Sequence, residues 1–191
     1  MDLVRMATSG CRWTDNELDA YNIDFTYQDA ATFFGPGELP LPQVDNELLD
    51  TLDAGNMLIQ TNAQLINYLD QAIDSGAHES AADDFAMALL QSLGYATHFR
   101  LICTRVVLPL NICGRSTSAR ANPNVCILDR AESDMICLIQ ENKPGGRDQI
   151  EPRAQLIAEA IAAFNYNNLK RTEMGQEITL LDKVYYKVRI T

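Results

Sequence analysis

The feature that most constrains the fold of this chain is a change in its hydrophobic period near Gly94. Before that glycine, apolar residues recur at spacings of three, four and seven, which is typical of amphipathic helices. After it come three short apolar runs that are rich in β-branched residues and predict strands. The runs are His98–Leu110, Val125–Leu128 and Met135–Ile139. Because no helical pattern separates them, they indicate a meander of three strands.

Two helices are expected before these strands. The pattern that starts at Asp45 predicts a long helix, interrupted near Gly55 and ended by the Ser-Gly pair before Ala77. The second helix carries an apolar stripe from Ala82 to Leu93. Both helices therefore have one face suited to packing against a sheet or against each other.

The part of the chain after the three strands returns to a helical pattern. Glu151–Asn165 predicts a helix with Pro152 in its first turn. The chain closes with EITLL and VYYKVRI, two strand-like runs. The order of elements is then helix, three strands, helix and strand. This order predicts an α/β fold in which a mixed sheet is flanked by helices.

The distribution of charge and a cluster of proline and glycine residues divide the chain into two parts. A Pro/Gly cluster at Gly35–Pro42 is typical of a linker or loop. Residues 1–84 hold 16 Asp and Glu against 2 Lys and Arg, whereas residues 85–191 hold 10 against 13. We expect an acidic N-terminal helical extension over 1–74 and an α/β domain over 75–191. The mildly basic second half is compatible with a nucleic-acid partner, and the acidic surface is equally compatible with a role in solubility alone.

The composition also bears on the compartment. No apolar run reaches the roughly 18 residues needed to span a bilayer, and the N-terminus lacks the apolar stretch of a secretory signal. The five cysteines are odd in number and form no CxxC pair, which favours buried thiols over disulfides or a zinc site. We therefore expect an intracellular protein, cytoplasmic or nuclear, with no membrane partner. A homo-oligomer is compatible with the sequence.

Polar residues follow the apolar part of the third strand in an unusual way. By strand alternation Cys137, Ile139, Glu141 and Lys143 share one face. On the preceding strand, Asn124 is expected to stand beside this pair of charged residues. Burying such groups costs several kcal/mol unless they are paired or bound to a metal. The pattern therefore indicates that two neighbouring strands open onto a polar cleft.

These residues carry a family resemblance. Pro123-Asn124, followed by Glu141-x-Lys143, resembles the P-D…(D/E)-x-K signature of the PD-(D/E)XK superfamily, the restriction-endonuclease-like fold. The core of that family has the order helix, three strands, helix, strand. The resemblance covers about residues 79–168, and the chain is also similar to a group of uncharacterised fungal proteins with this core.

The resemblance implies a nuclease that hydrolyses phosphodiester bonds of DNA or RNA with Mg²⁺ or Mn²⁺. It implies that Glu79, Asn124 and Glu141 stand at the metal positions, since carboxylate and amide oxygens suit Mg²⁺. It gives Lys143 the role of the catalytic amine, which stabilises the phosphate or activates the water. It makes Gln155 the supporting side chain at the start of the following helix. The metal would neutralise charge on the phosphate.

The departure from the family pattern is Asn124, because the family has Asp at this position. An amide oxygen can ligate a cation but adds no negative charge, so metal affinity is expected to be weakened. Asp129 is near in sequence, yet its parity puts it on the other strand face unless a bulge intervenes. Three readings stay open: an attenuated nuclease, a catalytically inactive relative that acts as a binding or interaction module, or a nuclease whose Asp was replaced deliberately.

Overall fold

The structure is a computed structural model of the 191-residue chain. It describes residues 8–26, 29, 31–32, 35, 37, 44–74, 79–112, 119–141, 152–179 and 187–190. For Glu79, Pro152 and residues 137–141 and 187–190 it describes the backbone only.

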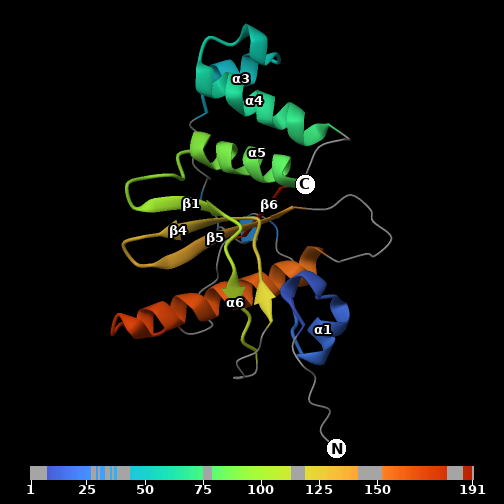
Figure 1. The fold of residues 1–191 in the computed structure, drawn as a ribbon, viewed down its shortest axis with the longest axis vertical. Helices are drawn as coiled ribbons and strands as arrows, with labels where there is room; N and C mark the ends of the chain where they lie inside the picture. The colour runs from blue at the N-terminus through green and yellow to red at the C-terminus, as the bar shows by residue number, and fades with distance from the viewer. Residues whose placement is uncertain are drawn as a thin grey trace, which may run out of the picture.

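A four-stranded mixed sheet with a helix on each face forms the centre of the molecule (Figure 1). The strands lie in the order β1-β4-β5-β6; the first three are antiparallel, and β6 runs parallel to β5. Helix α5 contacts one side and helix α6 the other. The α/β class predicted from the sequence is therefore confirmed. The bounds are α5 Glu79–Ser92, β1 Arg100–Thr104, β4 Val125–Asp129, β5 Asp134–Glu141, α6 Pro152–Glu173 and β6 Lys187–Ile190.

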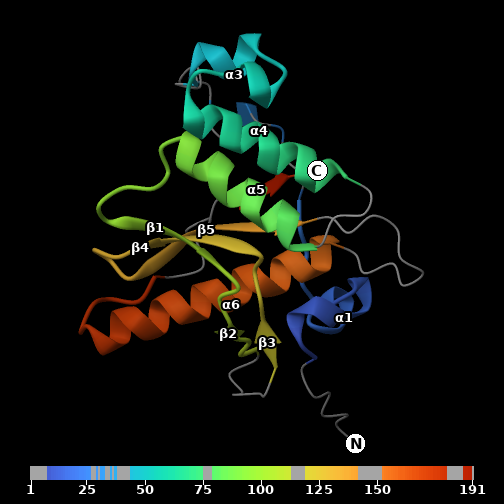
Figure 2. The same ribbon diagram turned by 45° about the horizontal axis from the view of Figure 1, so that its top comes forward.

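The prediction of one strand over His98–Leu110 is wrong. Strand β1 ends at Thr104, and Arg105 has a φ of 56°, in the left-handed region, which turns the chain out of the main sheet. The chain then enters β2 (Leu108–Pro109), which pairs with β3 (Arg120–Ala121) in a separate two-stranded sheet beside α6 (Figure 2). The turn was not predicted because the whole segment His98–Leu110 is rich in β-branched and apolar residues, which favour a strand throughout.

The last predicted helix begins as expected and is longer than expected. Helix α6 continues past Asn165 to Glu173, and the chain turns at Gly175, which has a φ of 70°. Its left-handed conformation suits glycine at a helix end. The predicted strand over EITLL is not found in its described part, Glu177–Thr179. Within VYYKVRI, β6 occupies the last four residues.

The long helix predicted from Asp45 is divided into three pieces: α3 (Asn46–Asp50), the 3-10 turn η2 (Ala54–Asn56) and α4 (Gln60–Ile73). The break falls at Gly55, as predicted, where the Asp53 carboxylate accepts the backbone N–H of Gly55. Helix α4 packs on the outer side of α5. No helix in the described ranges has the length and apolar character needed to cross a membrane.

Glu47 joins α3 to the start of α4. Its carboxylate accepts the backbone N–H groups of Leu58 and Ile59 and, at 2.9 Å, the side-chain amide of Asn62. Leu58 and the N-cap residue Ile59 directly precede α4, and Asn62 lies in its first turn, so Glu47 fixes the start of this helix. Hydrogen bonds from Leu58, Asn62 and Ile59 lower the pKa of Glu47.

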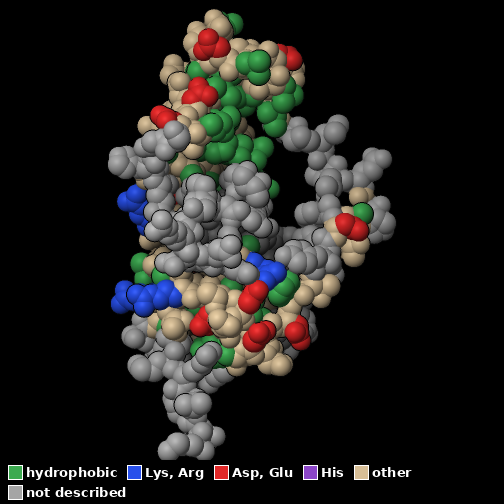
Figure 3. Space-filling view, turned by 90° about the vertical axis from the view of Figure 1, so that its right-hand side faces the viewer, with side chains coloured by type: hydrophobic (Ala, Val, Ile, Leu, Met, Phe, Trp, Pro, Cys, Tyr) green, Lys and Arg blue, Asp and Glu red, His purple; other side chains and the backbone are tan. Residues whose placement is uncertain are grey.

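The surface of this α3–α4 layer is unusual in being both acidic and apolar. The side chains of Leu52 and Leu58 are each 95% exposed, and that of Leu49 is 68% exposed. The upper part of Figure 3 shows hydrophobic side chains interspersed with Asp and Glu. Lys and Arg side chains in the same view lie below this layer.

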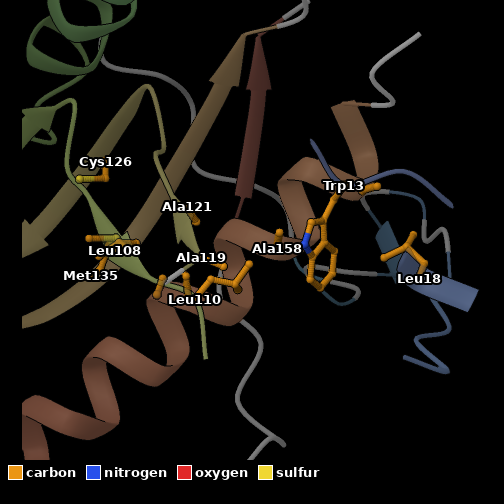
Figure 4. Packing of buried hydrophobic residues seen from close by; sticks show 12 residues of the cluster. Trp13, Leu18, Leu108, Leu110, Ala119, Ala121, Cys126, Met135 and Ala158 are labelled. Atoms are coloured by element: carbon orange, nitrogen blue, oxygen red, sulfur yellow. The ribbon is translucent and has the colours of Figure 1, made fainter. Parts of the chain in front are cut away.

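Two apolar clusters hold the sheet to its helices. Val125 and Ile127 of β4 pack with Ala86 and Leu90 of α5. The neighbouring Cys126 packs on the opposite side, as strand alternation requires. That second, larger cluster also draws residues from the N-terminal segment, the small sheet and α6 (Figure 4): Trp13, Leu18, Leu108, Leu110, Ala119, Ala121, Met135, Ala154, Ala158, Ala162 and Ala163.

Small residues allow the N-terminal segment to approach α6 closely. A Cβ added at Gly10 would lie 3.2 Å from the Cβ of Ala158. Trp13 is fully buried, and Figure 4 shows it between Ala158 of α6 and Leu18 of α1 (Asp15–Ala20). Part of the predicted acidic extension therefore contributes to the core under the sheet.

A buried amide fixes α6 against the sheet. Asn167 is fully buried; its Oδ1 accepts the backbone N–H of Met135 at 2.8 Å, and its Nδ2 donates to the Met135 carbonyl at 2.9 Å. One turn later, Arg171 forms an ion pair with Asp134. The start of β5 is thus joined to α6 by two polar contacts in addition to apolar packing.

Replacing Asn167 by Ala is expected to lower the free energy of unfolding by about 3 kcal/mol, because both backbone groups of Met135 would stay buried without this partner. Urea denaturation measures the change. Asn16→Ala, at an exposed position of α1, is the control and is expected to change stability by less than about 0.5 kcal/mol. Equal stabilities of the two variants would contradict this role for Asn167.

The lowered pKa of Glu47 predicts a pH-dependent contribution to stability. A carboxyl whose folded-state pKa is depressed stabilises the fold above its unfolded value, near 4.5, and this contribution is lost as pH falls through the folded pKa. Glu47→Gln is therefore expected to lower the melting temperature at neutral pH. The difference from wild type is expected to shrink as the pH falls below 4.5 and through the lowered folded-state pKa. Asp50→Asn, exposed on the same helix, is the control; a Glu47→Gln effect independent of pH would count against the interpretation.

Candidate functional site

The two halves of the sequence motif meet at one end of the sheet. The antiparallel register pairs Val125, the first residue of β4, with Ile139 near the end of β5. Pro123 and Asn124 directly precede β4, and Glu141 is the last residue of β5. The backbones that carry these residues therefore lie at the same end of the sheet, as expected.

Asn124 is bound to helix α5. Its Nδ2 donates to Oδ1 of Asp83 at 2.9 Å. The side chain of Asp83 is buried, with the residue 7% exposed. An ionised carboxylate only accepts hydrogen bonds, so the amide must present its NH₂ group to it. This contact joins the start of β4 to the helix across 41 residues of sequence.

The rule that side chains alternate along a strand predicts the wrong face of the sheet for Asn124. Strict alternation would put it on the face of Cys126, which packs on the α6 side of the sheet. Asn124 instead contacts α5, because it precedes the first residue of β4 and is not held to the strand geometry. A further irregularity in the pairing of β4 with β5 lies between Ile127 and Leu128. Asp129, at the other end of β4, forms an ion pair with Arg100 and is remote from Asn124 along the strand.

A cleft of about 430 Å³ opens at this contact. Its walls come from the start of α5, the turn after β1 and the segment that leads into β4. Both partners of the amide–carboxylate hydrogen bond line it. The lining residues are Ser80, Asp83, Arg105, Val107, Asn122, Pro123 and Asn124.

Gln155 lies on the opposite side of the sheet, near the start of α6. Its Nε2 donates to Oε1 of Glu159 at 3.3 Å. Glu159 is fully buried. Burying a carboxylate requires hydrogen-bonding partners, and Gln155 is one of them. The sequence had singled out Gln155 but not the buried carboxylate that it contacts.

The remaining predicted site residues are placed only in part. Glu79 begins α5, four residues and about one helical turn before Asp83, and its side chain is outside the described part. The same holds for the side chain of Glu141, and Lys143 is outside the described residues. In the ranges that the structure describes, no three His, Cys, Asp or Glu side chains form a group able to hold a metal.

Asp83 is the residue of this site that the sequence did not single out. It stands three residues before Ala86 and seven before Leu90, both buried against the sheet. These spacings put all three on one face of α5. The available signal was an acidic residue at helical spacing from buried apolar residues. The apolar stripe predicted from Ala82 onward did not include Asp83 because it was defined by apolar residues alone.

Comparison with models of protein families finds no match, and neither curated proteins nor solved structures include a similar one. The chemistry of the site therefore rests on its own residues.

A double-mutant cycle tests whether Asp83 and Asn124 act as one unit. Asp83→Ala, Asn124→Ala and the double variant are expected to show a coupling energy of about 0.5–3 kcal/mol in urea denaturation, as for residues in direct contact. Asp84→Ala paired with Asn124→Ala is the matched control, because Asp84 is the adjacent acid and forms no contact with Asn124 among the hydrogen bonds described. A coupling no larger than that of the control would show that the two side chains act independently.

Proposed function

We propose that this chain is a nuclease-like protein with the restriction-endonuclease-like fold, in which hydrolysis of DNA or RNA phosphodiesters is attenuated by Asn124. We place this function in the cytoplasm or the nucleus, as expected from the sequence. The observation that carries the proposal is the hydrogen bond of 2.9 Å between Asn124 and the buried carboxylate of Asp83, inside a cleft. It brings an anionic group to the position where the family pattern has its Asp.

The order of elements supports the family assignment. Helix α5, the three antiparallel strands, helix α6 and the parallel strand β6 follow one another as in the restriction-endonuclease-like core. The small sheet of β2 and β3 is an insertion between the first and second strands of that order. The meeting of Pro123-Asn124 with the end of β5 supports it further.

Asp83 supplies a negative charge that Asn124 lacks. With Asp at position 124, two carboxylates would face each other at hydrogen-bond distance, and a proton or a cation would be needed between them. With Asn, the amide NH₂ satisfies the carboxylate of Asp83 without either. The substitution thus removes the need for a metal ion while leaving one potential ligand in place.

The donor set suits a hard cation such as Mg²⁺ or Mn²⁺. Mg²⁺ is commonly held by one or two carboxylates and keeps several waters, so Asp83, Glu141 and the Oδ1 atom of Asn124 would be sufficient. Glu79, one turn before Asp83, would be a further ligand. When bound, the metal would neutralise charge on the phosphate and provide a nucleophilic water.

The amide of Asn124 determines by how much cation binding, and with it hydrolysis, is weakened. A cation that takes Oδ1 of Asp83 has to displace the Nδ2 group of Asn124 from that oxygen. A hydrogen bond to a charged group contributes about 1.5–3 kcal/mol, so its loss weakens cation binding about tenfold to a hundredfold. Lys143 would then hold the phosphate, and Gln155 would keep Glu159 in place at the start of α6.

The same hydrogen bond favours a second candidate function. If the amide of Asn124 keeps the Asp83 carboxylate engaged and the cleft binds no cation, the fold serves as a binding or interaction module without hydrolysis. The exposed leucines and carboxylates of the α3–α4 layer would then be available to a partner.

A cleavage assay with labelled DNA and RNA oligonucleotides in Mg²⁺, Mn²⁺ or EDTA tests the first function. We expect slow, metal-dependent cleavage by the wild type and an increase of at least about tenfold for Asn124→Asp, which restores the anionic ligand. Lys143→Ala in the Asn124→Asp background is expected to abolish cleavage, since the amine is lost while the metal ligands stay.

Asp84→Asn serves as the control, because it removes one acidic charge from α5 without touching Asn124. Absence of cleavage by both the wild type and Asn124→Asp, with either metal, would rule out the enzyme and leave the binding module.

A further inference from the structure

The backbone at Arg105 adopts a conformation that a non-glycine residue seldom takes. Its φ is 56°, and its N–H donates to the carbonyl oxygen of Asn124 at 3.3 Å. Residues held in the left-handed region carry strain that the surroundings must offset, and such residues cluster at ligand-binding sites. Asn22 and Ser133 share this backbone conformation, and of the three Arg105 is the one that lines the cleft beside Asn124.

The side chain of Arg105 lines the cleft and is exposed. Among the described residues it takes part in no ion pair; Arg12, Arg120 and Arg130 are unpaired as well, but Arg105 is the one that lines this cleft. The guanidinium thus stands at the cleft of an acidic protein without a described counter-ion.

Besides the carboxylate of Asp83, which is hydrogen-bonded to Asn124, the cleft has polar groups that can donate to an anion. Ser80 and Asn122 line the same cleft and have side-chain donors. A guanidinium matches the geometry of phosphate oxygens through two parallel N–H groups. In Figure 3 the Lys and Arg side chains lie below the acidic α3–α4 layer, so the positive charge is concentrated on the part of the molecule that contains the sheet.

We propose that Arg105 binds a backbone phosphate of the nucleic-acid strand that enters the cleft, and that the left-handed turn at the end of β1 exists to aim it. This inference rests on the proposed function and names a positioning residue for it. The contact is made to the backbone, so it is independent of base sequence. It also requires no metal, since the guanidinium is permanently charged.

Binding of labelled single-stranded and duplex DNA and RNA, measured by fluorescence anisotropy in EDTA over a range of salt concentrations, tests the proposal. Arg105→Ala is expected to weaken binding by about tenfold, equally across sequences, and to reduce the slope of log affinity against log salt by about one. Arg130→Ala is the matched control. Arg130 is also exposed and has no ion pair among the described residues, but it follows β4 at the end of the strand away from Asn124.

Arg105→Gly separates the role of the side chain from folding. Glycine accepts the positive φ, so this variant is expected to keep or raise the melting temperature while losing binding as Arg105→Ala does. If the wild type binds or cleaves nucleic acid and both Arg105 variants match Arg130→Ala in affinity and salt slope, the role of Arg105 is refuted and the proposed function stands. A wild type that neither binds nor cleaves any of the four substrates would refute both.

Discussion

The burial of one carboxylate against the start of a strand is the constraint on which the cleft depends. Asp83 is in line with the apolar residues of α5 that pack on the sheet, and a charge in that place is tolerated only with a hydrogen-bonding partner. Asn124 is such a partner, and its position directly before β4 fixes how the strand approaches the helix. The identity of residue 124 therefore governs both local stability and the charge of the cleft. An amide at this position can donate to the Asp83 carboxylate, whereas a second carboxylate there would require a proton or a cation between the two.

The rest of the architecture holds that end of the sheet in place. Helix α5 is packed between the sheet on one side and α4 on the other. On the other side, the alanines of α6 permit close contact with the sheet and with the N-terminal segment, and Asn167 ties the helix to Met135. The cleft thus lies at the edge of a layered core, where loops can carry polar groups without burying their backbone.

Hydrophobic period was sufficient to predict the order of the elements, because the change from spacings of three and four to β-rich runs is a property of the sequence itself. The turn at Arg105 was not predictable, since nothing in the sequence around an arginine indicates that its backbone adopts a left-handed conformation. Asp83 was missed because an acidic residue in a helix usually faces solvent, and only the positions of Ala86 and Leu90 show that it does not. The pairing of Asn124 with α5 escaped the alternation rule because that rule holds only inside a strand. Local pattern thus gave the elements, whereas the contacts of the site depend on tertiary packing.

The central claim is that Asn124, hydrogen-bonded to Asp83, weakens cation binding in this cleft, and that a carboxylate at position 124 would strengthen it. Calorimetric titration of Mn²⁺ into the wild-type protein and into Asn124→Asp tests it most directly. The account predicts binding that is at least about tenfold tighter in the variant, with the gain removed when Asp83→Ala is added. Equal affinity in the wild type and Asn124→Asp, or a gain that survives the loss of Asp83, would contradict it.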